Sequence, residues 1–274
     1  MPNNKQRNII GVFDSGLGGL TVLKHFLKKL PQYDYLYLGD TARVPYGSHS
    51  QDVIYKYTRE AVDFLFSQGC RLVILACNTA SSQALHRLQQ EYLPAKYPDR
   101  RILGVIIPLA EYASQFENIG IIGTRATISS GAYEQEIKKL KPKAKIIVNS
   151  APLLVPLIEE NWTGQDVINK ILKKYLYLLK KEKIKILILG CTHYPFLIKN
   201  IRRLMGKNCL VPDPGKIIAD SLENYLNKHP EFKNTDDGVK GVCNFALTDQ
   251  PENFLRLGEK FLGKKIDNLT IISL

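Results

Sequence analysis

Short apolar runs alternate along the chain with longer segments in which apolar residues recur three and four positions apart. The apolar runs cover residues 8–13, 35–38, 72–76, 102–106, 119–123, 145–148 and 184–190. The segments of helical period include residues 50–68, 81–92, 128–140 and 167–181. Short apolar runs separated by amphipathic segments are typical of βαβ units. The pattern therefore predicts a mostly parallel sheet that is covered by helices.

Two of the runs, LVILA and ILILG, are apolar at almost every position. This is expected for strands whose two faces are both covered by helices. Ligands in such folds bind at the carboxyl ends of the strands. The residues directly after each run are therefore the first candidates for a functional site.

A weak internal repeat indicates how the strands are arranged. The segment LVILACNTASS aligns with ILILGCTHYPF at an offset of 114 residues, so that Cys77 falls on Cys191. The segment IIGVFDSG, around Asp14, aligns less well with GIIGTRAT, around Thr124, at an offset of 110 residues. Because the two offsets are so close, we infer two similar α/β halves that face each other, each with one cysteine at the mouth of its sheet.

The predicted fold is α/β, with two similar doubly wound parallel-sheet domains related by pseudo-twofold symmetry and the active site in the cleft between them. Breaks rich in proline and polar residues occur at residues 93–99 and 207–215. The residues after the second break are too few for a third domain. We therefore expect residues 1–98 plus 211–274 to form one domain and residues 99–210 to form the other.

Composition narrows the class of protein. The chain has 274 residues, of which 45% are hydrophobic and 23% are charged, and this excludes disorder as its main state. No apolar run is long enough for a membrane span or for a signal peptide. The five cysteines are odd in number and scattered, so no disulfide framework is expected. These features predict a cytoplasmic protein with reduced thiols, and the net charge of +12 makes an anionic substrate or partner plausible.

Cys77 and Cys191 each follow a predicted buried strand. A thiol at the start of a helix lies near backbone N–H groups and the positive end of the helix dipole, which favours the thiolate. Either cysteine could then act as a base near neutral pH, whereas the alternative is a small buried hydrophobe. The residues that follow the two cysteines are polar, unlike those of a core: Asn78, Thr79, Thr192 and His193.

The other three cysteines, Cys70, Cys209 and Cys243, lack a comparable polar sequence after them and are interpreted as structural. Zinc sites need ligands that are paired at short spacings such as C-x₂-C, and the sequence has no such pair. We therefore expect no metal.

The segment DSGLGGL, residues 14–20, resembles a phosphate-binding glycine turn. Thr21 stands where the third glycine of G-x-G-x-x-G belongs, and the ending of a P-loop is missing, so a nucleotide site is not expected. Backbone N–H groups at a helix start can hold a carboxylate as well as a phosphate. Asp14 is either a cap or a carboxylate of the site, and both interpretations stay open.

A loop and two lysine runs can each be interpreted either as part of a binding site or as ordinary structure. In the loop GDTARVPYG, residues 39–47, Tyr46 could close over a small ligand, or the loop could be a simple connection. The lysine runs at residues 138–145 and 180–185 are interpreted as solvated helix ends rather than binding patches. No nucleic-acid-binding motif accompanies them.

Taken together, six motifs resemble the motif set of glutamate racemase, a cofactor-independent enzyme. They are DSGLGGLTVL, GDTARVPYG, ACNTAS, GTRATISSGAY, VPLIEE and LGCTHYP, and they occur in the right order between about Val12 and Gly215. The related aspartate racemases also pair two cysteine motifs. They usually carry an acidic residue where this chain has Thr192 and His193, so His193 favours glutamate.

The resemblance implies an isomerase that interconverts L- and D-glutamate, with Cys77 and Cys191 as acid and base. It implies that Asp14, Glu159 and His193 support proton transfer, and the choice between Glu159 and Glu160 stays open. The residues implied to bind or line the substrate are Asp14, Ser15, Pro45, Tyr46, Gly47, Asn78, Thr79, Thr124, Thr192 and His193.

The resemblance also implies a role in the cell. The D-glutamate would supply peptidoglycan synthesis, and with it cell wall biogenesis and cell shape, in the cytoplasm. The expected partner is the small-molecule substrate, with no nucleic acid and no membrane, and a homodimer stays open. The alternatives are a racemase of aspartate or another small acid, and a basic nucleic-acid-binding protein with passive thiols.

The chemistry of racemisation agrees with the internal repeat. Inverting an α-carbon requires a base that removes a proton from one face and an acid that returns one to the other face. Two halves that each offer one thiol supply this geometry. The sequence shows no marker of a pyridoxal site, so fixed donors near Ser15, Asn78, Thr79 and Thr192 would have to stabilise the carbanion through the substrate carboxylate.

Overall fold

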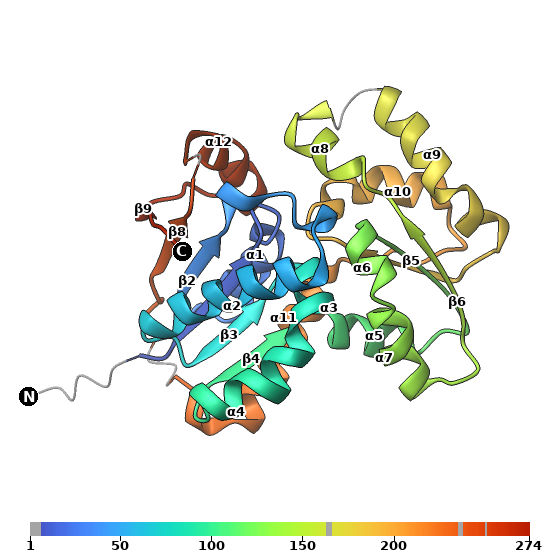
Figure 1. Cartoon of the computed structure of the whole chain (residues 1–274). Coiled ribbons are helices and arrows are strands. Elements are labelled where there is room, and N and C mark those ends of the chain that lie inside the picture. Colours follow the sequence, from blue (N-terminus) through green and yellow to red (C-terminus); the bar gives the residue numbers. More distant parts are fainter. Residues whose placement is uncertain (1–6, 163–165, 235–237, 250) are drawn as a thin grey trace, which may run out of the picture.

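The structure is a computed structural model that describes residues 7–162, 166–234, 238–249 and 251–274. Within these residues the strands form two separate parallel sheets (Figure 1). The first has the strand order β4-β3-β1-β2-β8-β9, and the second has the order β6-β5-β7. The strands of the first sheet are β1 (Ile9–Asp14), β2 (Asp34–Gly39), β3 (Leu72–Leu75), β4 (Arg101–Gly104), β8 (Cys243–Leu247) and β9 (Leu269–Ile271). The strands of the second are β5 (Asn118–Gly123), β6 (Lys145–Ser150) and β7 (Ile186–Gly190).

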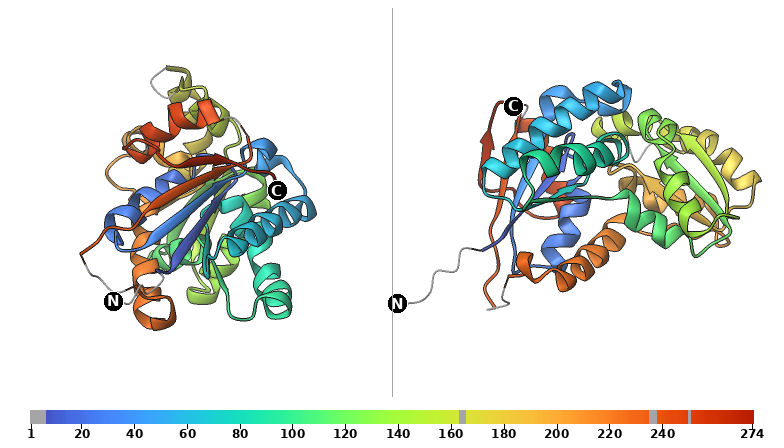
Figure 2. Two further views of the ribbon diagram at one scale, coloured as in Figure 1. Left: turned by 90° about the vertical axis from the view of Figure 1, so that its left-hand side faces the viewer. Right: turned by 60° about the horizontal axis from the view of Figure 1, so that its bottom comes forward.

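Helices surround both sheets, and the two lobes lie side by side in the right-hand view of Figure 2. The helices of the first part of the chain and of its C-terminal return are α1 (Leu20–Lys29), α2 (Gln51–Ser67), α3 (Asn78–Arg87), α4 (Leu93–Lys96), α11 (Pro214–Lys228) and α12 (Pro251–Leu262). Those of the second lobe are α5 (Ile106–Ala113), α6 (Arg125–Ser129), α7 (Ala132–Leu140), α8 (Leu154–Glu159), α9 (Asp166–Lys181) and α10 (Ile198–Met205). Shorter turns are η1 (Thr41–Arg43), η2 (Tyr46–Ser48), the π-helical η3 (Leu88–Tyr92), η5 (Tyr194–Leu197) and η6 (Pro230–Phe232).

Successive strand residues of the first sheet pack on opposite faces. Val12 belongs to the core cluster that contains Phe26 of α1, whereas Phe13 belongs to a second cluster that contains Leu65 of α2. All four side chains are fully buried. Since both faces of the sheet are covered, the strands have little need for polar positions, and the doubly wound α/β fold predicted from the sequence is confirmed.

The repeat is visible in the topology. In the first sheet β1 lies between β3 and β2, and in the second β5 lies between β7 and β6, in the matching order. The cysteine motifs follow β3 and β7, as the sequence alignment requires. The halves differ in size, because β4, β8 and β9 have no counterparts among the described strands of the second sheet.

Several element boundaries differ from the sequence pattern. The run at 102–106 is strand only to Gly104, and α5 begins at Ile106. The helical segment 128–140 is broken, since Gly131 adopts a left-handed conformation (φ 66°) between α6 and α7. A glycine reaches this conformation at little cost, and other residues do so rarely. The sequence pattern did not predict β8 and β9 as strands. Both are short, and β8 pairs with β2, which lies far from it in sequence.

We propose the division of the chain into residues 1–98 plus 211–274 and residues 99–210 with one change. Residues 101–104 form β4, which pairs with β3 of the first sheet. The chain therefore enters the second lobe only after Gly104. No helix in the described part of the chain has both the length and the apolar character needed to cross a bilayer.

Candidate active site

A cavity of about 450 Å³ lies where the carboxyl ends of the two sheets meet. This is the place at which parallel α/β sheets bind ligands. Of the thirteen site residues expected from the sequence, all but Asp14 line the cavity: Ser15, Pro45, Tyr46, Gly47, Cys77, Asn78, Thr79, Thr124, Glu159, Cys191, Thr192 and His193. The fold thus brings residues that are far apart in the chain together around a single cavity.

Cys77 lies between β3 and α3, and it caps the helix. Its Sγ accepts a hydrogen bond from the backbone N–H of Ala80 and donates to the hydroxyl of Ser15, both at 3.5 Å. The side chain is almost fully buried. Burial, together with the nearby carboxylate of Asp14, raises the pKa of Cys77 to about 12. The two hydrogen bonds lower the pKa, but their effect is smaller. The sequence suggested a thiolate at the helix start, but the raised pKa makes this sulfur a thiol at neutral pH.

Cys191 directly follows β7 of the second sheet and lines the same cavity as Cys77. Its Sγ lies 4.0 Å from Nδ1 of His193, and Nε2 of the same ring lies 3.0 Å from Oε1 of Glu159. Burial alone would lower the pKa of His193, but Cys191 and Glu159 outweigh it and raise the pKa to about 10. His193 is therefore an imidazolium at neutral pH, and it can donate toward the sulfur and toward the carboxylate at once.

Glu159, not Glu160, is the carboxylate that the structure brings to this chain of contacts. It is the last residue of α8 and lines the cavity. Its ion pair with His193 is partly exposed on the carboxylate side. Of the two adjacent glutamates between which the sequence left the choice open, Glu159 is the one that contacts His193. Its role in proton transfer stays a prediction.

Asp14 lies beneath the cavity instead of on its wall. Its carboxylate accepts hydrogen bonds from the backbone N–H of Gly16 at 3.1 Å and from the hydroxyl of Thr192 at 3.2 Å. It is fully buried, and burial raises its pKa, although His193 and hydrogen bonds from the backbone and from Thr192 oppose the shift. Asp14 thus joins the loop after β1 to the loop after β7 across the two lobes.

The glycine turn after β1 serves close packing between the lobes. A Cβ added to Gly18 would overlap the Thr192 hydroxyl and the His193 ring, and one added to Gly19 would lie 2.5 Å from Cβ of Asp14. Gly18 therefore lets side chains of the second lobe approach the backbone of the turn, and Gly19 lets the turn pack against Asp14 of its own lobe.

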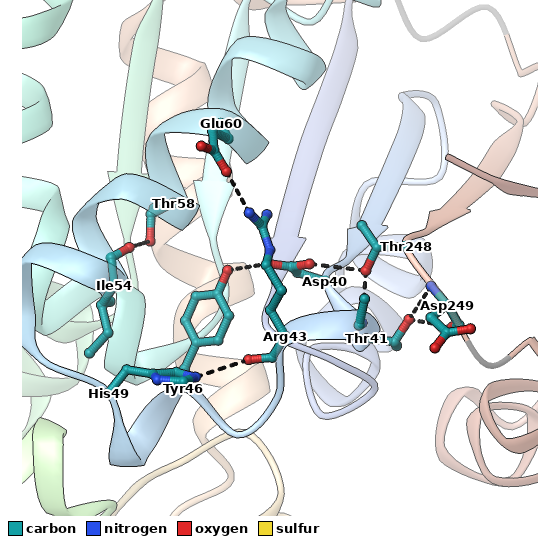
Figure 3. A network of polar contacts seen from close by, with 11 residues as sticks. Asp40, Thr41, Arg43, Tyr46, His49, Ile54, Thr58, Glu60, Thr248 and Asp249 are labelled. Atoms are coloured by element: carbon teal, nitrogen blue, oxygen red, sulfur yellow. Dashed lines mark hydrogen bonds and ion pairs between the residues drawn. The ribbon is translucent and has the colours of Figure 1, made fainter. Parts of the chain in front are cut away.

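A buried polar network holds the loop that carries Tyr46 (Figure 3). The carboxylate of Asp40, fully buried, accepts hydrogen bonds from the Tyr46 hydroxyl at 2.5 Å, from Arg43 Nε at 2.7 Å and from Thr248 at 2.9 Å. Arg43 also pairs with Glu60 of α2 at 2.5 Å. Since the hydroxyl of Tyr46 is taken up by Asp40, the ring faces the cavity as a fixed wall.

Hydroxyl and amide groups link the lobes beside the cysteines. The hydroxyl of Thr79 lies 2.9 Å from that of Thr124 and 3.2 Å from that of Thr127. Asn78 accepts a hydrogen bond from the Tyr133 hydroxyl at 2.6 Å through its side-chain oxygen. The amide nitrogen of Asn78 is thereby turned away from Tyr133, which suits it to donate to a ligand.

Sequence reasoning missed several cavity residues: Val44, Ser48, Arg125, Pro152, Leu153, Val155 and Pro156. Arg125 matters most, because it is the only lysine or arginine along this cavity in the described part of the chain. It directly follows Thr124 in the segment GTRAT, and this adjacency was the one signal that could have identified it. Pro152 and Leu153 lie just before the motif VPLIEE, and Val155 and Pro156 are part of it, but none of the four has polar chemistry that would single it out.

The remaining cysteines, Cys70, Cys209 and Cys243, do not line the cavity. Among the described residues no group of three or more His, Cys, Asp and Glu side chains is placed to hold a metal ion. What the cavity offers is two thiols, one from each lobe, together with an imidazolium, the carboxylate of Glu159 and several hydroxyl and amide donors. This set can remove and return a proton and can hold an acidic ligand.

Comparison with known proteins finds racemases both among family models and among individual proteins. Residues 18–222 match the family model described as Asp/Glu/hydantoin racemase. A glutamate racemase from Geobacter metallireducens is 39% identical over 97% of this chain and 96% of its own length. One from Aquifex aeolicus is 39% identical over 94% of this chain and 95% of its own.

Solved structures lead to the same group. A glutamate racemase from Francisella tularensis, in complex with D-glutamate, has a TM-score of 0.89 and 34% identity and covers 97% of this chain and 98% of its own. An aspartate racemase from Picrophilus torridus has a TM-score of 0.53 and 16% identity, and this likeness shows the fold alone.

Proposed function

This chain belongs to the Asp/Glu/hydantoin racemase family and is an amino-acid racemase, and we propose that it interconverts L- and D-glutamate through Cys77 and Cys191 without a cofactor. The observation that carries the proposal is that each lobe places one of these thiols on the same cavity. Racemisation by acid and base on opposite faces of a carbon requires two such groups.

The reaction balances between the two sulfurs. A thiolate on one side takes the α-proton, and the electron pair of the broken C–H bond is delocalised into the α-carboxylate. The thiol on the other side then gives its proton to the α-carbon and becomes the thiolate. The product has the opposite configuration, and the two cysteines have exchanged protonation states, so that the enzyme is ready for the reverse reaction.

The electrostatics of the cavity support this sequence of steps. The raised pKa of Cys77 makes this residue the proton donor of the resting site. The imidazolium of His193 lies beside the sulfur of Cys191 and is held by Glu159. His193 can therefore offset negative charge on that side of the substrate as the proton moves.

Donors near the cysteines are placed to hold the carboxylate that receives the electron pair. Ser15, Asn78, Thr79 and Thr192 all line the cavity, and the first of these already contacts the sulfur of Cys77. We propose that they bind the α-amino acid part of the substrate, with Tyr46, Gly47, Pro45 and Thr124 as further walls. Fixed dipoles that surround the developing charge reduce the barrier without reorganisation.

Two observations favour glutamate over aspartate. The relatives that share 34–39% of the sequence over nearly its whole length are glutamate racemases. The likeness to aspartate racemase is limited to the fold. The resemblance noted in the sequence adds a third argument, since aspartate racemases usually carry an acidic residue where this chain has Thr192 and His193.

The physiological role follows from the product. We propose that the D-glutamate is used for peptidoglycan synthesis in the cytoplasm, and through it for cell wall biogenesis and cell shape. The partner at the site is then the free amino acid. A homodimer is compatible with this proposal but is not required by it, since one chain supplies both thiols.

The proposal is tested by the loss of optical activity of each enantiomer with the purified protein and no added cofactor. We expect L- and D-glutamate to reach the same equimolar mixture, and kcat/KM for glutamate to exceed that for aspartate by at least about ten-fold, as expected for a side chain one methylene shorter. Equal or faster turnover of aspartate would overturn the choice of substrate. Inactivity toward both amino acids would overturn the proposed function.

A further inference from the structure

Most of the net positive charge of the chain comes from one segment. Residues 166–210 contain eleven lysines and arginines and only two acidic residues, a surplus of nine out of the net charge of +12. The segment forms α9, β7 and α10 of the second lobe. The proposed reaction uses only Cys191, Thr192 and His193 of this segment, so its cations have no assigned role.

The cations of α9 and α10 lie on adjoining surfaces. Lys180 of α9 donates to the backbone oxygen of Leu204 of α10 at 2.9 Å, and Arg203 donates to Asn169 at 2.9 Å. The two helices accordingly lie side by side in the second lobe, with α9 at its outer edge (Figure 1). The charges of the segment are therefore gathered in space as well as in sequence.

Two neighbouring hollows mark this surface. One, of about 520 Å³, lies between α9 and the end of α10 and is lined by Lys173, Leu176, Tyr177, Lys180, Lys181 and Leu204. The other, of about 850 Å³, lies beyond the end of α10, and its cations are Lys185, Arg202, Arg203 and Lys207. No aspartate or glutamate is among the described residues that line either hollow. We call the seven cations of the two hollows the basic face.

Large apolar side chains stand exposed among these cations. On α9, Tyr177 is 68% exposed and Leu178 is 43% exposed, and Leu210 beside the second hollow is 43% exposed. Aliphatic side chains gain little from the phosphates of a nucleic acid, whereas at a lipid surface they enter the boundary between headgroups and acyl chains. Tyrosine is also favoured at that boundary. The combination fits a lipid surface better than a nucleic acid.

The position of the basic face leaves the active-site cavity free. The second hollow includes Lys185, directly before β7, and Leu210, which bridges to Ile186 at the start of that strand. The catalytic cavity lies at the opposite, carboxyl end of β7, where Cys191 follows. A surface that contacts the basic face would not cover the thiols.

We propose that the basic face is a docking surface for a membrane that contains anionic lipids. Its lysines and arginines would contact the headgroup phosphates, while Tyr177 and Leu178 enter the interface. Clustered cations beside a few apolar anchors give reversible attachment that weakens with salt. The proposal goes beyond racemisation, and it revises two expectations from the sequence: that the lysine run at residues 180–185 is only a solvated helix end, and that no membrane is a partner.

The test uses the full chain and two kinds of vesicle, phosphatidylcholine alone and phosphatidylcholine mixed with phosphatidylglycerol. In co-sedimentation we expect binding to the anionic vesicles only, with a decrease as salt is added. The triple variant Lys173→Gln, Lys181→Gln, Lys207→Gln should lose at least about ten-fold in apparent affinity. The double variant Tyr177→Ser, Leu178→Ser should weaken the binding that persists at higher salt.

The matched control removes the same number of charges from exposed positions of the first lobe: Lys24→Gln, Lys28→Gln, Lys265→Gln. Its affinity should change by less than about two-fold, and racemase activity of every variant should stay at the level of the unmodified protein, which shows that each is folded. Failure of the unmodified protein to bind anionic vesicles would overturn the proposal, as would an equal loss in the two triple variants. Tighter binding to duplex DNA than to the vesicles, with the same sensitivity to the three lysines, would assign the face to nucleic acid instead.

Discussion

Replacing either Cys77 or Cys191 by alanine should reduce kcat for racemisation by at least about 10³-fold, because each variant lacks the only acid or base on one face of the α-carbon. Both thiols line the cavity, and no other cysteine among the described residues lines it. Optical rotation of L- and D-glutamate over time measures the loss. The two variants should be affected in both directions of the reaction, since each cysteine serves as base in one direction and as acid in the other.

The control is Cys243→Ala, which removes a half-buried thiol that does not line the cavity. Its kcat should remain within about two-fold of the unmodified value. Any proton exchange that survives in the two active-site variants should be confined to one enantiomer in each, and to opposite enantiomers in the two. Retention of racemisation in either variant would show that the missing thiol is not one of the two bases.

Replacing His193 by asparagine should lower kcat by about 10²-fold, the usual contribution of a positioned acid or base. The residue links the sulfur of Cys191 to the carboxylate of Glu159, and an amide of similar reach cannot carry the positive charge. KM should change less than kcat, because the charge acts as the proton moves. Matching the effect with Glu159→Gln, and finding little effect with Glu160→Gln, would assign the supporting carboxylate.

The substitution His193→Asn should also change how the free energy of unfolding depends on pH. The pKa of His193 is raised from 6.5 to about 10 in the folded chain, so its protonated form stabilises the fold. This contribution is fully present below pH 6.5 and is lost as the pH rises toward 10. The difference in free energy of unfolding between the unmodified protein and His193→Asn should therefore shrink across this range. A difference that stays constant with pH would show that the imidazole is not charged in the folded state.

The sequence located the two cysteines because both signals are local. A buried strand followed by a cysteine and a polar residue can be seen in a short window, and the repeat adds the second copy. Parallel strands place such residues at one edge by geometry alone. The central strands and the polar residues next to them could be predicted for the same reason.

Other parts of the site depend on contacts that no local pattern contains. Asp40 is a buried carboxylate whose partners lie at Arg43, Tyr46 and Thr248, and the last of these arrives only after the chain has returned from the second lobe. That return also brings β8 beside β2, far from it in sequence. Arg125 could not be ranked above other exposed arginines until the fold showed that it lines the cavity.

Asp14 shows how an open alternative is resolved by tertiary structure. The sequence allowed a cap or a carboxylate of the site. The structure shows that it accepts hydrogen bonds from the turn that follows it and from Thr192 of the other lobe. Its catalytic role stays a prediction, because the residue supports the loops that carry the site and does not itself line the cavity.

The most direct measurement is the fate of the α-proton when the reaction runs in deuterium oxide. With two opposed bases, the proton taken from the substrate stays on one sulfur while a deuteron arrives from the other, so early product carries deuterium and recovered substrate carries almost none. Mass spectrometry of the separated enantiomers at low conversion reads both values. Rapid appearance of deuterium in the substrate as well as in the product would indicate a single exchanging base, and it would contradict racemisation by Cys77 and Cys191 from opposite sides.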